Sequence, residues 1–207
     1  MNEGQRRPAG EFSAWLSSLL VAVRHGTNSD TPCDGCVACC SSSQFVHIGP
    51  DETEALDHIP AEVRFAAPGA PDGYVLMGYD EQGRCPMLAD TGCTIYEHRP
   101  RTCRTYDCRV FPAAGLAPGE GKQRVAERSA EWEFDHRDER ARVEHAAVQA
   151  AAAYLERRRG DFPPGAVPLA PTQVALLACE AHPAFLDTPD PEPEAVRVAI
   201  RSHRSPA

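Results

Sequence analysis

Apolar residues near the start of the chain recur at steps of three and four. Such spacing places them on one face of an α-helix. The helix is expected to end near Gly26, because Arg24 and His25 suit the last turn of a helix and glycine commonly follows it. Residues 1–10, which precede the pattern, are predicted to be a flexible start. The periodic positions are Phe12, Trp15, Leu16, Leu19, Leu20 and Val23.

Short apolar runs farther along the chain predict a small β element. Gln44–Ile48 and Tyr74–Tyr79 each have the length and residue types of a strand. Between them, Gly49–Glu52 resembles the start of a helix with acidic residues in its first turn, and Pro60 would end that helix. Residues 113–121 contain glycines and a proline, which predict a linker or surface loop.

The second half of the chain has a helical pattern. Residues 122–159 are rich in Ala, Glu and Arg and contain neither Gly nor Pro, which predicts one long helix or two in succession. Two shorter helices are expected at about Thr172–Cys179 and Glu192–Arg201. The predicted fold class is therefore mainly α with a small β element, in which helices flank an irregular, metal-nucleated, cysteine-rich core.

Composition narrows the functional classes. The chain has 207 residues, of which 42% are hydrophobic and 25% charged, so it can bury a sizeable core. Its formal net charge of −9 argues against a binder of nucleic acid or of an anionic membrane surface. We see no apolar run near the roughly 18 residues that a membrane span requires, and no secretory signal. These features favour a cytoplasmic protein.

Cysteine usage is the unusual feature of the chain. Nine cysteines are present, and eight of them lie between Cys33 and Cys108. In a cytoplasmic protein, clustered thiols are more often metal ligands or redox groups than disulfides. We expect an N-terminal helix over residues 1–26, a metal-binding cysteine region over 27–112 and a helical region over 113–207. The ninth cysteine, Cys179, is expected to be an ordinary core thiol.

The first cysteine motif is Cys33-x-x-Cys36-x-x-Cys39-Cys40. Two-residue spacing lets a loop fold back so that two sulfurs reach one ion, and three such sulfurs resemble the start of a ferredoxin motif. A ferredoxin motif does not continue with an adjacent cysteine. Because neighbouring side chains of an extended backbone point in opposite directions, Cys39 and Cys40 are expected to serve different ions. Alternatively, one of the two is a packing or redox thiol.

The second motif supplies four further cysteines, Cys85, Cys93, Cys103 and Cys108. Eight thiolates are enough for two tetrahedral sites. Four thiolates around one divalent ion carry excess negative charge, which nearby guanidinium groups would offset. Arg99 and Arg104 are the candidates, either as donors to sulfur or as partners of Glu97 and Asp107.

Histidines are weaker candidates for ligation. His47, His58 and His98 lie inside the cysteine region, but eight cysteines already fill two sites. His136 and His145 are nine residues apart in the predicted long helix, or two and a half turns. We therefore expect them to face opposite sides of it, at the surface.

These motifs resemble the CxxCxxCC proteins of the YkgJ type. The matching segments are CDGCVACC from Cys33, CPML from Cys85, GCTIYEHRPRTCR from Gly92, and Cys108. The resemblance implies that the chain chelates zinc or iron. Some relatives are described as iron–sulfur oxidoreductases, and a flagellin lysine N-methylase carries a similar cluster, but no substrate-site residues for either activity are evident here.

Several functions stay open at this point. The ferredoxin-like spacing favours an iron–sulfur cluster or iron over zinc as the cofactor. The protein could then be a redox enzyme or its accessory. Alternatives are a structural-zinc interaction module without catalytic activity, which would bind a protein partner through the C-terminal helices, and a protein of metal storage or delivery.

Overall fold

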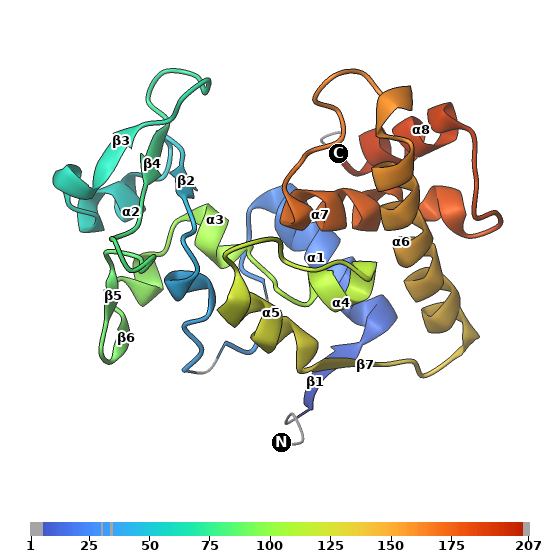
Figure 1. Ribbon diagram of the computed structural model, residues 1–207, viewed down its shortest axis with the longest axis horizontal. Coiled ribbons are helices and arrows are strands. Elements are labelled where there is room, and N and C mark those ends of the chain that lie inside the picture. The colour runs from blue at the N-terminus through green and yellow to red at the C-terminus, as the bar shows by residue number, and fades with distance from the viewer. Residues whose placement is uncertain (1–5, 30, 34, 205–207) are drawn as a thin grey trace.

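The computed structural model describes residues 6–29, 31–33 and 35–204, which form two lobes (Figure 1). The larger lobe contains β1 (Arg7–Glu11), α1 (Phe12–His25), α4 (Val110–Ala114), α5 (Gln123–Ala130), β7 (Trp132–Asp135), α6 (Glu139–Arg157), α7 (Pro171–Ala181) and α8 (Pro193–Arg204). The smaller lobe contains β2 (Val46–Ile48), α2 (Thr53–His58), β3 (Arg64–Ala66), β4 (Val75–Met77), β5 (Leu88–Ala89), β6 (Gly92–Cys93) and α3 (Arg101–Arg104). The predicted class, mainly α with a small β element, is confirmed.

Short 3₁₀ turns complete the described secondary structure. They lie at Cys39–Ser41, Ala61–Val63, Tyr96–His98, Arg159–Asp161 and His182–Phe185. Across the described ranges, no helix combines the length and the apolar character that crossing a membrane would demand.

Helix α1 forms as its periodicity predicts. The Glu11 side chain caps the helix by accepting hydrogen bonds from the backbone N–H groups of Ser13 and Ala14, at 3.1 and 2.8 Å. Gly26 ends the helix in the left-handed conformation, at φ +63°. The apolar face of the helix is buried in the larger lobe, as Trp15 illustrates with 3% of its surface exposed.

Strands β1 and β7 correct two predictions. Residues 7–10 belong to a strand rather than to a flexible start. Residues 122–159 contain two helices, α5 and α6, which was one of the two predicted alternatives, but the strand β7 between them was not predicted. The two strands pair in parallel, with Arg7 opposite Trp132. Trp132 and Phe134 are buried while their neighbours are exposed, which is the two-residue period of a strand. The pairing joins distant segments, so local periodicity does not reveal it.

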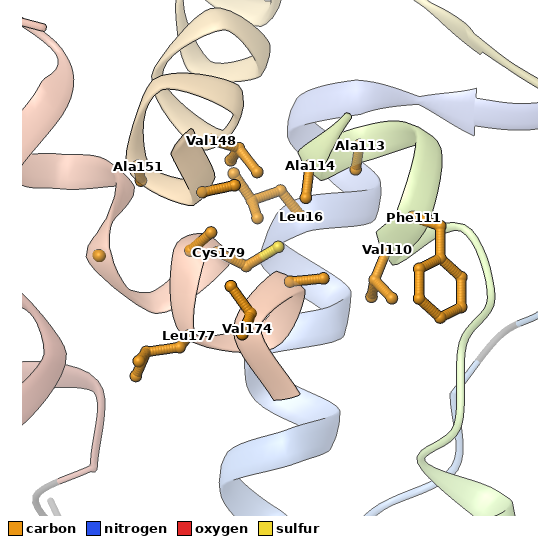
Figure 2. Close-up of a cluster of buried hydrophobic side chains, with 14 of the residues drawn as sticks. Leu16, Val110, Phe111, Ala113, Ala114, Val148, Ala151, Val174, Leu177 and Cys179 are labelled. Carbon is orange, nitrogen blue, oxygen red and sulfur yellow. The ribbon is translucent and has the colours of Figure 1, made fainter. Parts of the chain in front are cut away.

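The larger lobe is organised around one hydrophobic core. Figure 2 shows side chains from α1, α4, α6 and α7 meeting there. Leu16, Val110, Val148 and Val174 are each at most 3% exposed. Cys179 points into the same core with none of its surface exposed, which confirms its assignment as a core thiol.

The smaller lobe has a much smaller core beneath an antiparallel sheet of strand order β2-β4-β3. Strand β3 was not predicted, whereas β2 and β4 lie within the two predicted strands. The buried residues of this core are Val46, Ile48, Ile59, Met77 and Ile95. Three cysteines, Cys85, Cys93 and Cys103, pack against it and are only partly buried.

The His136–His145 pair contradicts the expectation that these residues face opposite sides. His136 precedes the first residue of α6, so helical spacing does not relate the two positions. Its Nε2 lies 2.8 Å from Nδ1 of His145, and the His145 ring stacks on Phe12 with centroids 4.2 Å apart. Burial lowers the pKa of His145, and the adjacent His136 acts in the same direction.

We predict that this lowered pKa makes the protein less stable in mild acid. The unfolded chain takes up a proton near pH 6.5, the usual histidine value, while the folded protein resists protonation. The free energy of unfolding should therefore fall as pH decreases from about 7.5 to about 5.5. Urea denaturation should show a smaller fall for His145→Gln than for the wild type. Equal falls in both proteins would contradict the prediction. Burial also lowers the pKa of His182. This residue therefore contributes in the same direction, and the variant retains it.

Candidate metal centre

The eight clustered cysteines are all free thiols. They come from separate parts of the chain: the loop after α1, the turn at Cys39–Ser41, the β5–β6 region, α3 and the segment before α4. The donor set is therefore soft sulfur, which suits zinc and iron.

The first group of thiols surrounds a cavity of about 20 Å³, which has room for about one small atom or water molecule. A tight turn brings its first two members together, since the backbone N–H of Cys36 donates to the carbonyl of Cys33 at 2.6 Å. The cavity is lined by Cys33, Cys36, Cys39 and Cys108, together with Thr31, Ala38, Tyr106, Val125 and Arg128.

The second group consists of Cys85, Cys93 and Cys103, beside the core of the smaller lobe. Burial, together with the charges of Cys39, Cys85 and Cys93, raises the pKa of Cys103 to about 12. The backbone N–H of Cys85 donates to the carbonyl of Cys40 at 2.7 Å, so Cys40 lies against this group.

Cys39 and Cys40 lie between the two groups with their sulfurs 3.9 Å apart. The expectation that they point in opposite directions assumed an extended backbone, but the pair begins a 3₁₀ turn. Four sulfurs at 2.3 Å from a tetrahedral ion are about 3.8 Å from one another. The observed separation is therefore compatible with ligation of one ion by both residues. The charge of Cys39 acts on Cys33 in one group and on Cys103 in the other.

Within the described ranges, no three His, Cys, Asp or Glu side chains converge closely enough to hold an ion in common. Binding an ion in either group therefore requires sulfur atoms to move towards a common centre, which rotation about Cα–Cβ bonds can achieve. Burial also raises the pKa of Cys33 to about 11 and that of Cys108 to about 12. A metal cation must consequently displace protons from these thiols.

Two side-chain N–H groups donate hydrogen bonds to sulfurs of the first group. Arg128 Nε lies 3.1 Å from Cys36 Sγ, and Trp132 Nε1 lies 3.1 Å from Cys108 Sγ. Both donors follow the cysteine motifs in sequence and were not predicted. Hydrogen bonds of this kind stabilise negative charge on a thiolate and tune the metal that it binds.

Arg99 and Arg104, the arginines predicted to offset the negative charge of the thiolates, have other surroundings. Arg99 donates from Nε to the carbonyl of Tyr96 at 2.7 Å, and its charge opposes the raised pKa of Cys33. Arg104 Nε is buried without a hydrogen-bond partner. Asp107 pairs with Arg109 rather than with either predicted arginine.

Comparison with known proteins decides the family. The model of the CxxCxxCC family, described as a "putative zinc- or iron-chelating domain", matches residues 32–139, just over half of the chain. The chain belongs to the CxxCxxCC family. No curated protein and no solved structure matches it. The matched region of this CxxCxxCC protein runs past the last clustered cysteine and includes the sulfur donors Arg128 and Trp132.

Helix α5 holds the CxxCxxCC segment against the larger lobe. Lys122, just before the helix, donates from Nζ to the carbonyls of Ser42 and Ser43, at 2.6 and 3.0 Å. Arg124 donates to Ser41 Oγ at 3.1 Å. With Arg128, these residues place three cations along a motif that becomes negative when its thiols are deprotonated.

A buried ion pair fixes the backbone on both sides of Cys108. Arg109 Nη2 lies 2.7 Å from Asp107 Oδ2, and both side chains are less than 5% exposed. Asp107 also accepts a hydrogen bond from Trp15 Nε1 at 2.9 Å, and Arg109 Nη1 donates to the carbonyl of Ala9. The position of Cys108 is thus tied to β1 and α1.

The histidines of the cysteine region make other contacts. The His58 and His98 rings stack with centroids 3.7 Å apart, and His98 Nδ1 lies 2.8 Å from Glu54 Oε1. His47 is an exposed residue of β2. None of the three lines the cavity of the first group.

We predict that metal protects the clustered cysteines from alkylation. A thiolate bonded to a cation reacts slowly until the metal is removed, whereas a buried thiol reacts slowly until the protein unfolds. All eight residues should label faster after chelator is added to the native protein, and Cys179 should respond only to denaturant. Labelling is mapped by peptide mass spectrometry. Rapid labelling of four or more clustered cysteines before chelation would contradict the prediction.

Proposed function

We propose that this CxxCxxCC protein binds two metal ions at adjacent four-cysteine sites. The first site would use Cys33, Cys36, Cys39 and Cys108. The second would use Cys40, Cys85, Cys93 and Cys103. The observation that carries the proposal is the division of the free thiols into two groups, one around a cavity and one beside the smaller core.

Two contacts support the assignment of the adjacent cysteines to different ions. Cys39 lines the cavity of the first group, whereas the carbonyl of Cys40 accepts a hydrogen bond from the second-group residue Cys85. Ligation of one ion by both is the alternative that the 3.9 Å sulfur separation supports. Substitution of each residue separately distinguishes the two arrangements, because shared ligation makes both variants lose the same ion.

The cavity favours a single iron or zinc ion at the first site. Four cysteine sulfurs line this small cavity, which is the number that one tetrahedral ion takes. A single ion needs only modest movement of the four sulfurs. When bound, the ion would supply a cross-link between Cys108 and the cysteines of the first motif, Cys33, Cys36 and Cys39.

An iron–sulfur cluster at the first site is the second candidate. The spacing of Cys33, Cys36 and Cys39 resembles that of ferredoxins, and the N–H donors of Arg128 and Trp132 are of the kind that adjusts the potential of a cluster. Such a cluster would support electron transfer, whereas zinc would leave the protein a metal-stabilised interaction module. A protein partner of the C-terminal helices and a cytoplasmic location stay predictions.

We predict that anaerobically purified protein contains about two metal ions per chain, the number that eight thiolates can hold tetrahedrally. Elemental analysis should show one ion fewer in Cys36→Ser and in Cys103→Ser, because each variant removes a ligand from a different site. Both variants should also melt at a lower temperature, since metal binding supplies folding free energy.

The control is Cys179→Ala, which should keep all the metal because Cys179 is a core residue of the larger lobe. Assay of acid-labile sulfide on the same samples separates the candidates. Sulfide together with iron would identify a cluster, and metal without sulfide would identify single ions. Full metal content in a Cys36→Ser/Cys103→Ser double variant would refute the two-site proposal.

A further inference from the structure

The hydroxyl of Tyr106 is buried without a hydrogen-bond partner. Buried hydroxyl groups nearly always have a partner, because leaving the group unpaired forfeits the hydrogen bonds it makes with water. Arg104 Nε and Ser13 Oγ are also unpartnered. Tyr106 differs from them because it lines the cavity of the first cysteine group.

The phenol lies among thiols that become charged when metal binds. A tyrosine hydroxyl has an ordinary pKa of about 10 and is protonated at neutral pH. The hydroxyl therefore stays protonated and remains a donor. A neutral thiol is a weak acceptor, whereas a thiolate attracts O–H and N–H groups much more strongly.

Two side chains already donate hydrogen bonds to sulfurs that line this cavity. Arg128 donates to Cys36, and Trp132 donates to Cys108. Of the four sulfurs that line the cavity, those of Cys36 and Cys108 have these donors, and those of Cys33 and Cys39 are left for the hydroxyl of Tyr106. Of the two, Cys39 packs with Tyr106 against the core of the larger lobe. In the larger lobe, Tyr154 provides a contrast, because its hydroxyl donates to the carbonyl of Pro191 at 3.0 Å.

We propose that Tyr106 is a positioning residue of the first metal site, whose hydroxyl donates a hydrogen bond to the metal-bound thiolate of Cys39. The bond would form when a divalent cation displaces the thiol protons and draws the sulfurs together. This inference rests on the proposed metal-binding function. It adds a group outside the cysteine motifs that stabilises the ligated thiolate without contacting the ion.

The test compares Tyr106→Phe with the matched control Tyr154→Phe. Zinc affinity is measured by competition with a chromophoric chelator, and the thiolate-to-metal charge-transfer bands are recorded with cobalt(II). Loss of a group that supports a metal ligand typically weakens binding about 10- to 100-fold. Tyr106→Phe should show that loss for one of the two ions and shifted cobalt bands. In excess chelator it should melt like the wild type, since the removed hydroxyl has no partner in the described structure.

Tyr154→Phe should behave in the opposite way. It loses the bond to Pro191 and should melt at a lower temperature, while its zinc affinity and cobalt spectrum stay unchanged. If the wild type binds two ions and Tyr106→Phe matches it in affinity and spectrum, the role of Tyr106 is overturned while the proposed function stands. If the wild type binds no zinc or cobalt, both are overturned.

A measurement on the wild type covers the case in which Tyr106→Phe does not fold. Ultraviolet Raman bands of tyrosine report whether the hydroxyl donates a hydrogen bond. Adding zinc to the chelator-treated protein should shift these bands for one of its five tyrosines. Unchanged bands at full zinc occupancy would overturn the inference.

Discussion

The buried ion pair of Asp107 and Arg109 ties the metal centre to the fold of the larger lobe. A buried charge that loses its partner destabilises a protein by about 3–5 kcal/mol, so the two residues must stay together. Their further bonds to Trp15 and to the backbone of Ala9 extend this constraint to α1 and β1. Cys108, between them in sequence, is consequently held in place by this network.

The two lobes depend on the cysteines to different extents. The larger lobe has an extensive apolar core from segments on both sides of the cysteine region, and Cys108 lies at its edge. The smaller lobe buries few large apolar side chains, and three thiols form part of its packing. Metal binding would therefore contribute most to the smaller lobe and to the junction at Cys39 and Cys40.

Three positively charged side chains lie beside the first cysteine motif and the residues that follow it. The whole chain is acidic, yet Arg128 contacts Cys36, and Lys122 and Arg124 contact the serines that directly follow Cys40. Thiolates around a divalent ion carry excess negative charge, and these cations offset it where it would develop. The local environment of the first site thus favours deprotonated sulfur once a metal ion is present, although burial alone favours the neutral thiol.

The sequence by itself determined the features that depend on neighbouring residues. The three-and-four spacing predicted α1, Gly26 marked its end, and the cysteine motifs identified the family and the eight candidate ligands. Tertiary structure decided the pairing of β1 with β7, the division of the thiols into two groups, and the placement of Arg128, Trp132 and Tyr106 around one of them. Periodicity reports only which face of an element is apolar, whereas these contacts join segments up to about 125 residues apart. Only the packing of the two cores brings such segments together.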